Sequence, residues 1–457
     1  MTNESSLRAL ANDLTGEVIE PTHPSFDQTK TSFYDEFNDR KPLAVARVAD
    51  AADVARVIGF SRDTGVRLAV RAGGHSMLGH SASEGGLVLD LSAIGGVDLE
   101  VEKRTAWVGG GVLAGEYTRV TGEHGLVTGF GDTGSVGISG ITFGGGVGFL
   151  HRKLGMTIDS LLGAEVVTAD GEIRTIDEGN DPDLFWAIRG GGGNFGVATR
   201  LHFRLHPVDT VLGGMLILPA SPALVADFVS VSREASDDLS VVAGVAMAPP
   251  LPFLPPEVHG ELIVMAFMVH AGSPETAERE VGRLRSLATP LVDGLETMRY
   301  PEIYADEDAP HPAAMSVRSV FSDDLTIEDA EAAITALTSS TADMSVLQIR
   351  VLGGAVARIP NDATAFGHRH RAMILNVAAA YQDPGQRPEH DAWVEDLGEH
   401  LAGGSPGSYI NFLGDDSPDT VRAAYPPATW QRLVDVKTKY DQDNLFSSNH
   451  NIAPRSR

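Results

Sequence analysis

The sequence contains no cysteine among its 457 residues. Disulfide bonds, thiolate metal ligands and cysteine nucleophiles are therefore excluded, although this absence says little about the cellular compartment.

Histidine gives weak support for a metal site. His368 and His370 are two residues apart, but no third ligand lies near them and no His-Glu-x-x-His motif occurs. We expect no metal.

The sequence also lacks any run rich in lysine or arginine. Its 35 basic and 62 acidic residues give a formal net charge of -27. A surface of this sign repels phosphate backbones, so we expect no nucleic-acid partner. No apolar run is long enough to span a membrane, and residues 1–16 lack the pattern of a secretory signal. We therefore expect a cytoplasmic protein with no membrane partner. The oligomeric state is not indicated.

Glycine, by contrast, is abundant, with 50 residues. A short buried strand is predicted at residues 66–70 and another at 86–91, with a glycine turn, residues 71–76, after the first strand. In this turn Gly73 and Gly74 allow positive φ and leave N–H groups free to bind phosphate oxygens, and Arg71 adds a positive charge. His75 follows directly. The turn predicts a site for a large anionic cofactor.

A second glycine-rich segment, residues 129–148, contains nine glycines. Apolar residues such as Ile138 and Phe143 are interleaved with them, which favours a structured loop over a flexible linker. Its N–H groups and hydroxyls suit a pyrophosphate.

Two other nucleotide or catalytic motifs have less support. Residues 107–122 resemble a strand, glycine turn and helix, but the glycine spacing is wrong for a Rossmann site and no acidic residue ends a second strand. Close packing of helix and strand explains these glycines equally well. A Ser-His-Asp hydrolase is also disfavoured, because no G-x-S-x-G motif is followed by the required helix.

The pattern of predicted elements changes near residue 206. Short strands alternate with helices before it, whereas longer strands are predicted afterwards at 212–218, 261–270, 346–357 and 373–381. Amphipathic helices are predicted at 273–288, 326–339 and 388–401, and a further helix begins near 429. A chain of this length exceeds the size that one core usually supports. The later pattern predicts a sheet covered on one face by helices.

Four segments give the sequence a family likeness. The glycine turn, with Gly79 and the 88–92 strand, resembles the FAD-attachment segment of the vanillyl-alcohol oxidase superfamily, and in particular of berberine-bridge-enzyme-like oxidases. Residues 131–148, 184–197 and 437–446 continue the resemblance in order. It implies an α+β fold. A PCMH-type FAD-binding domain of two α/β subdomains would comprise residues 1–205 and 415–457, and an inserted substrate domain, an antiparallel sheet covered by helices, residues 206–414.

The resemblance also implies the cofactor site. The matching histidine, His75, would be bonded to the 8α-methyl of FAD. Thr133 stands where many relatives have a cysteine that makes a second bond, so attachment would be single. The other expected cofactor-binding residues are Arg71, Ala72, Gly73, Gly74, Ser76, Met77, Gly79, His80, Gly131, Thr133, Gly134, Ser135, Val136, Gly137, Ser139, Gly140, Phe143, Gly144, Gly146, Val147, Gly148, Gly196, Val197, Tyr409, Asn411 and Asn449.

For catalysis, residues 408–412 resemble the Tyr-x-Asn segment of these oxidases. Tyr409 is the first candidate for the base, and Tyr381 is the second. Either tyrosine can equally be a core residue with its hydroxyl satisfied. Gln348 and Asn376 are candidates for binding substrate hydroxyls, and polar pairing within the core is at least as well supported. Phe412 replaces a tyrosine of many relatives, and no glutamate base is identified.

The implied function is an FAD-dependent oxidase. It would oxidise an alcohol, hemiacetal or related C–H of a carbohydrate or secondary metabolite by hydride transfer to covalent FAD, with O2 reduced to H2O2. Two alternatives stay open: a flavin-dependent oxygenase or dehydrogenase that releases no H2O2, and a flavoprotein that only binds its ligand.

Overall fold

The computed structural model describes residues 3–304 and 313–456. Near the N-terminus, a four-stranded sheet has the order β1-β2-β4-β3, in which β1 is Glu17–Ile19 and β2 is Ala44–Arg47. Helix α3 (Ala51–Thr64) covers it. The Asp50 carboxylate caps the first turn of this helix, and Gly65, at φ 70°, ends it. Strand β3 (Leu68–Arg71) runs parallel to β4 (Leu87–Asp90), as the sequence predicts. The glycine turn therefore leaves the carboxyl end of a buried strand.

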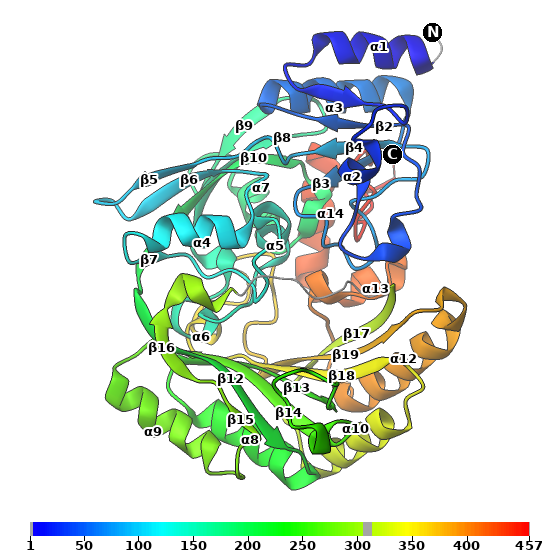
Figure 1. The fold of residues 1–457 in the computed structure, drawn as a ribbon. Coiled ribbons are helices and arrows are strands. Elements are labelled where there is room, and N and C mark those ends of the chain that lie inside the picture. Colours follow the sequence, from blue (N-terminus) through cyan, green and yellow to red (C-terminus); the bar gives the residue numbers. More distant parts are fainter. Residues whose placement is uncertain (1–2, 305–312, 457) are drawn as a thin grey trace.

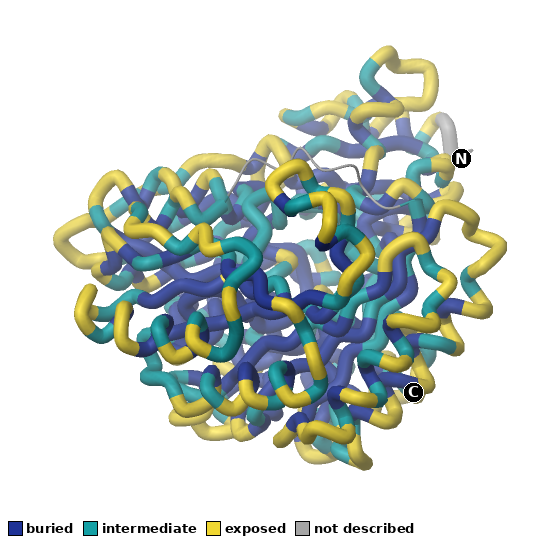
Figure 2. The backbone as a smooth tube through the Cα atoms, turned by 60° about the horizontal axis from the view of Figure 1, so that its bottom comes forward, coloured by how far each residue is buried: buried dark blue, intermediate teal, exposed yellow. Residues whose placement is uncertain are grey.

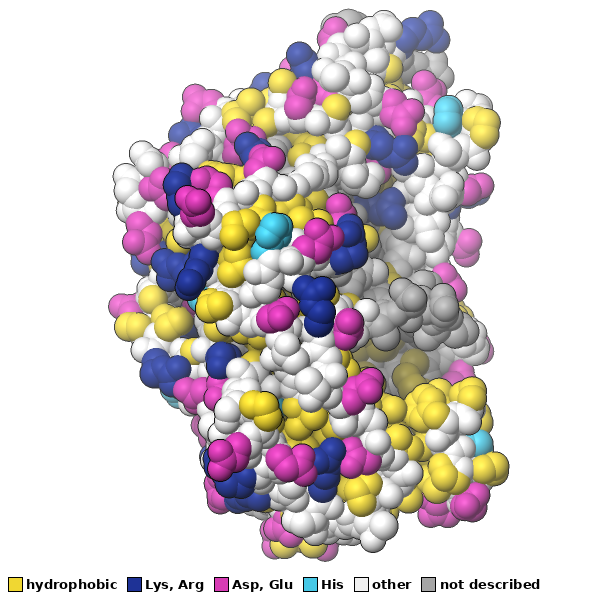
Figure 3. Space-filling view, turned by 60° about the vertical axis from the view of Figure 1, so that its left-hand side comes forward, with side chains coloured by type: hydrophobic (Ala, Val, Ile, Leu, Met, Phe, Trp, Pro, Cys, Tyr) yellow, Lys and Arg dark blue, Asp and Glu magenta, His cyan; other side chains and the backbone are white. Residues whose placement is uncertain are grey.

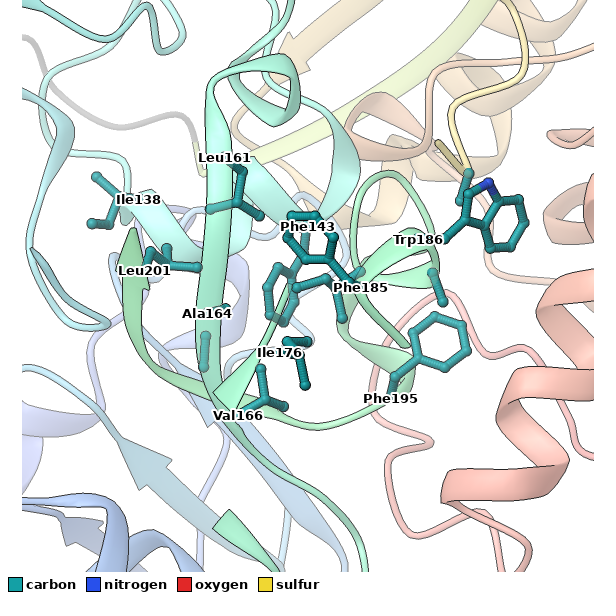
Figure 4. Packing of buried hydrophobic residues seen from close by; sticks show 14 of the residues in the cluster. Ile138, Phe143, Leu161, Ala164, Val166, Ile176, Phe185, Trp186, Phe195 and Leu201 are labelled. Atoms are coloured by element: carbon teal, nitrogen blue, oxygen red, sulfur yellow. The ribbon is translucent and has the colours of Figure 1, made fainter. Parts of the chain in front are cut away.

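A second sheet of five strands follows, in the order β5-β6-β10-β8-β9. It includes β5 (Val97–Glu100), β9 (Ile173–Ile176) and β10 (Val197–Arg204). Its core contains α5 (Ile138–Gly144) and α7 (Pro182–Ala187) beside β8 (Leu161–Val167). Figure 4 shows the rings of Phe143 and Phe185 near this strand, with Phe195 farther from it in the same cluster. A Cβ added at Gly111, after β6 (Thr105–Gly109), would lie 1.9 Å from the Leu91 carbonyl oxygen. Close packing of the two sheets thus accounts for these glycines.

The third sheet is the largest, with eight strands. Its order is β15-β12-β14-β13-β18-β19-β17, with β16 also paired to β12. The two short strands are β15 (Val292–Asp293) and β16 (Glu296–Arg299). The predicted strands correspond to β12 (Thr210–Pro219), β14 (Leu262–His270), β18 (Met344–Val351) and β19 (Met373–Tyr381). The sequence analysis missed β13 (Leu239–Met247) and β17 (Ala314–Ser322). It also made β18 too long, because Gly353 and Gly354 adopt positive φ and turn the chain into α11 (Ala355–Arg358).

Four helices cover one face of this sheet. They are α8 (Pro222–Glu234), α9 (Pro274–Arg285), α10 (Ile327–Ser339) and α12 (Arg387–Ala402). All four share one apolar cluster with alternate residues of the strands. The other face, called the inner face here, turns toward the first two sheets (Figure 1). The expected fold class, a mixed fold with an antiparallel sheet covered by helices, is confirmed.

After this sheet the chain returns to the first part of the fold. Ile410 and Leu413 pack in the same cluster as Phe185, and so do Leu433 and Tyr440 of α14 (Pro427–Tyr440). The return thus begins a few residues before the expected boundary at 415. In Figure 2 the buried segments gather inside the molecule and the exposed segments form its loops and outer helices.

The surface carries charges of both signs, in line with the 35 basic and 62 acidic residues of the sequence. Figure 3 shows acidic and basic side chains interspersed on one face. Within the described ranges, no helix has both the length and the apolar character needed to cross a membrane.

Lys437 fixes the C-terminal helix in place. Its side chain is fully buried, and Nζ donates to the Asn194 and Phe446 carbonyl oxygens at 2.9 Å and to Asp441 Oδ2 at 2.6 Å. Burial lowers the pKa of Lys437, although Asp441 acts in the opposite direction. All three ammonium hydrogens thus have an acceptor.

We expect Lys437→Met to lower the free energy of unfolding by about 3–5 kcal/mol, because Asp441 keeps a buried charge without its partner. Denaturant unfolding followed by tryptophan fluorescence measures the change. Arg119→Met is the control: it removes an exposed pair with Glu123 and should change stability by less than about 1 kcal/mol. Equal effects of the two substitutions would contradict this assignment.

Candidate active site

A cavity of about 390 Å³ lies where the three parts of the fold meet. Its walls come from the glycine turn, the glycine-rich segment 131–147, residues 192–198, residues 409–412 and residues 446–450. These segments are far apart in the sequence. They meet because β3 ends at the cavity, α5 begins there, and the C-terminal segment returns to it.

The glycine turn and the glycine-rich segment touch backbone to backbone. A Cβ added at Gly73 would lie 2.3 Å from the Gly137 nitrogen, and one added at Gly137 would lie 2.5 Å from the Gly73 nitrogen. Any side chain at either position would separate the two segments. Gly74, at φ 77°, then turns the chain, and its carbonyl accepts from the Phe33 N–H at 3.1 Å.

This contact places His75 on the cavity wall. Its Nε2 lies 2.8 Å from Ser135 Oγ, so the second segment holds the ring directly. The Phe33 ring stacks on the imidazole with a centroid separation of 4.1 Å and an interplanar angle of 28°. The ring therefore has a fixed orientation in the cavity wall.

The cavity has features of a cradle for a large ligand. A Cβ added at Gly140 would meet no atom within 4 Å, although this residue lies inside helix α5, where glycine is unfavourable. Its lack of a side chain leaves the cavity open. Among the described residues no lysine or arginine lines the cavity. Backbone N–H groups, which the glycine turn presents, are suited to bind phosphate in their place. Buried Asn449 Oδ1 on the wall has no hydrogen-bond partner in the described part of the chain. These features fit FAD.

Comparison with known proteins agrees with this fit. The FAD binding domain family matches residues 42–177, and the family described as berberine and berberine like matches residues 408–453. (R)-6-hydroxynicotine oxidase of Paenarthrobacter nicotinovorans is 30% identical over 466 residues, which cover 98% of this chain and 99% of that protein. The chain belongs to the berberine-bridge-enzyme-like family of FAD-linked oxidoreductases.

Solved structures support the same conclusion for the fold. A crystal structure of 6-hydroxy-D-nicotine oxidase from Arthrobacter nicotinovorans has a TM-score of 0.85 at 27% identity, covering 97% of this chain and 99% of that one. A xylooligosaccharide oxidase from Myceliophthora thermophila, solved with xylobiose, has a TM-score of 0.86 at 20% identity, and the match covers all of both chains. This berberine-bridge-like chain thus has the full fold of its relatives.

Most of the expected cofactor residues of this berberine-bridge-like oxidoreductase line the cavity. Those that do so are Ala72, Gly73, Gly74, His75, Ser76, Met77, His80, Gly131, Thr133, Val136, Gly137, Ser139, Gly140, Phe143, Val147, Gly196, Val197, Tyr409, Asn411 and Asn449. Others lie behind the wall as packing positions. A Cβ at Gly79, Gly144 or Gly148 would come within 2.4 Å of a neighbouring atom. Gly134, Ser135 and Gly146 also lie outside the lining.

Two predicted residues point elsewhere. Arg71 does not line the cavity; its guanidinium donates to the Thr29 carbonyl, and burial lowers its pKa. It therefore contacts the N-terminal segment in place of the expected phosphate. Tyr381 is on the helix-covered side of β19, where its hydroxyl lies 3.0 Å from Ser316 Oγ and its ring packs on His390. The alternation of side chains along the strand turns it away from the cavity.

Tyr409 does reach the cavity, next to 3-10 helix η7 (Ile410–Phe412). Its hydroxyl oxygen accepts from the Gly146 N–H at 2.8 Å and from Asn411 Nδ2 at 3.0 Å. Burial raises the pKa of Tyr409 to about 12, although both hydrogen bonds act in the opposite direction. The phenol is thus neutral near pH 7. Its role as base stays a prediction, and its protonation state favours a donor role.

Sequence reasoning missed several side chains of the wall, among them Phe33, Tyr34 and Asp132. Phe33 and Tyr34 come from a segment without a recognisable motif, and Asp132 lies inside the glycine-rich segment. Asp132 was not among the expected cofactor-binding or catalytic residues. A carboxylate in a segment otherwise suited to an anionic cofactor is the signal that could have identified it.

The cradle can be tested at Gly140. We expect Gly140→Leu to lower the ratio of bound flavin to protein severalfold, because the new side chain projects into the cavity. The melting temperature of the flavin-free fraction should not fall, since a Cβ there meets no neighbour. Absorbance and calorimetry measure the two quantities.

Gly282→Leu is the matched control. Gly282 is also a helical glycine with open space around its Cβ, but it lies in α9, away from the cavity. Its flavin ratio should equal that of the unmodified protein. A full flavin load in Gly140→Leu would rule out this position as part of the cradle.

Proposed function

We propose that the protein is an FAD-dependent oxidase that carries its flavin on His75 and oxidises an alcohol, hemiacetal or related C–H of a small molecule. The observation that carries the proposal is the position of His75. It lies on the wall of the one cavity that also includes the glycine cradle and the Tyr409 to Phe412 segment. The (R)-6-hydroxynicotine oxidase relative, at 30% identity, supports an oxidase.

The bound flavin would supply hydride acceptance and reoxidation by O2, with H2O2 as the product. The chain's own residues would bind and orient the substrate. Because the Tyr409 oxygen already accepts two hydrogen bonds, its O–H hydrogen is available as a donor. We assign it to a substrate oxygen or nitrogen. A neutral phenol suits this task without any change of protonation state.

The inner face of the large sheet offers a second set of polar groups. Gln348 of β18, Asn376 of β19 and Ser319 of β17 are in register across three strands. Asn376 Nδ2 donates to Gln348 Oε1 at 3.1 Å, whereas Asn376 Oδ1 and Ser319 Oγ are buried with no hydrogen-bond partner among the described residues. Gly244 of β13 continues the row. This row supports a substrate with hydroxyl or amide groups, such as a carbohydrate or secondary metabolite.

The attachment of the flavin is the first test. The purified protein should be yellow and stay yellow after acid precipitation, and His75→Ala should release its flavin under the same treatment. Mass spectrometry of the peptide that contains residue 75 measures the bond. Free FAD in the supernatant of the unmodified protein would refute covalent attachment.

Thr133 supplies a second arm of this test. If it occupies the position of the second attachment, Thr133→Cys in the His75→Ala background should restore some acid-stable flavin, since a thiolate forms at mildly alkaline pH. Thr133→Ser in the same background is the control and should restore none.

The electron acceptor is a separate test. With xylobiose, 6-hydroxynicotine and 4-hydroxybenzyl alcohol as candidate substrates, turnover should consume O2 and release H2O2 in equal amounts. Added NAD or NADP should not accelerate it. An oxygen electrode and a peroxidase-coupled assay measure both. Turnover without H2O2 would favour the oxygenase or dehydrogenase alternative.

A further inference from the structure

Asp132 has an unusual place in the cavity. Of the described residues that line it, Asp132 alone carries a carboxylate. Its side chain is 27% exposed, so one oxygen is accessible while the other is engaged. A negative charge does nothing to hold the phosphates of an anionic cofactor. Cofactor binding therefore does not account for this residue.

Arg350 holds the engaged oxygen. Its Nη2 donates to Asp132 Oδ2 at 2.7 Å and to Gln348 Oε1 at 2.9 Å, and its side chain is 2% exposed. The guanidinium also lies over the Phe412 ring, 4.9 Å from the centroid. Arg350 comes from β18 of the large sheet, so a rigid element from one side of the cavity fixes a loop residue of the other side.

The second oxygen, Asp132 Oδ1, is not held in this way. Its hydrogen bond within the described residues is a long one, 3.5 Å from Thr133 Oγ1. Thr133 lines the same cavity. The carboxylate thus has one oxygen fixed by a buried cation and the other available to a ligand in the cavity.

We propose that Asp132 is the proton acceptor of substrate oxidation, with Oδ1 as the accepting atom. The inference rests on the proposed function. The O–H or N–H bond of the substrate breaks, and its proton passes to Oδ1. The two electrons of the adjacent C–H bond leave as the hydride that the oxidase reaction requires, and a C=O or C=N bond forms. The partial exposure of Asp132 gives the proton a path to solvent.

The neighbouring groups favour Asp132 over any phenol. Tyr34, Tyr304 and Tyr409 lie close enough for the Asp132 charge to contribute to their raised pKa values, after the larger effect of burial. For Tyr34 and Tyr409 the pKa is about 12. All three phenols are protonated near pH 7, so none of them can take up the substrate proton. Asp132 is therefore the group that accepts the proton, and Arg350 is the cation paired with it.

The decisive experiment compares Asp132→Asn with Tyr409→Phe in stopped-flow reduction of the enzyme-bound flavin under argon. The substrate is whichever of the three named candidates reduces the unmodified enzyme. We expect Asp132→Asn to slow reduction by about 10²- to 10⁴-fold, and Tyr409→Phe to slow it less. The melting temperature of Asp132→Asn should fall, because buried Arg350 loses its anionic partner, but flavin content and the dissociation constant for that compound should change by less than threefold in the folded variant.

The pH profile gives a readout that a structural role would not change. Reduction by the unmodified enzyme should fall at acidic pH, and Asp132→Asn should lack this decline. Among the described residues, the groups that interact with the Asp132 charge are Arg350, Tyr34, Tyr304 and Tyr409, and the pKa values of the three phenols are raised above 10. His75 also lines the cavity but is present in both proteins. A decline lost only in Asp132→Asn therefore belongs to the carboxylate.

Asp324→Asn is the matched control, because Asp324 pairs with Arg233 at 3.1 Å on the surface. It should leave the rate unchanged. Reduction of Asp132→Asn at the unmodified rate, or with the same acid decline, would overturn the inference while the oxidase function stands. Failure of all three compounds to reduce the unmodified enzyme would instead refute the proposed function for these substrate classes and, with it, the inference.

Discussion

The contact between the backbones of Gly73 and Gly137 determines the geometry of the site. Neither position tolerates a Cβ, because it would overlap a nitrogen of the other segment. This approach brings Ser135 to His75, and the turn residues from Ala72 to Ser76 line the cavity. The two segments are anchored by different sheets, since the turn follows β3 and the second segment leads into α5. Each sheet therefore depends on the other to complete the cradle.

A strongly acidic protein must here bind an anionic cofactor. A net charge of -27 would repel a pyrophosphate at long range. The structure meets this problem with backbone dipoles, because no lysine or arginine of the described residues lines the cavity. Arg71, the charge expected there, is directed to Thr29. The cation nearest the chemistry is Arg350, and Asp132 neutralises it.

The sequence predicted the cradle well and the opposite wall poorly, for physical reasons. Glycine spacing reflects local backbone geometry, so the turn at His75 and the segment around Gly137 were recognisable without a structure. The residues expected to act in catalysis were harder to place from the sequence. Tyr381 and Asn376 are on the same strand, yet alternation places Asn376 on the inner face and Tyr381 among the helices. A shift of one residue in the predicted register reverses such an assignment.

The role of Asp132 was harder still to predict, because it depends on Arg350, which is 218 positions away in the sequence. Within its own segment it is a polar residue among glycines, which a turn explains equally well. Only the pairing of β18 with its neighbours brings Arg350 beneath it and turns one oxygen toward that cation. The same pairing puts Gln348 against the guanidinium and Phe412 across its face. The arrangement of groups around Asp132 is thus a product of sheet register. Of the two candidate residues, Asp132 is paired with a buried cation and is the charged acceptor, whereas Tyr409 is the neutral donor.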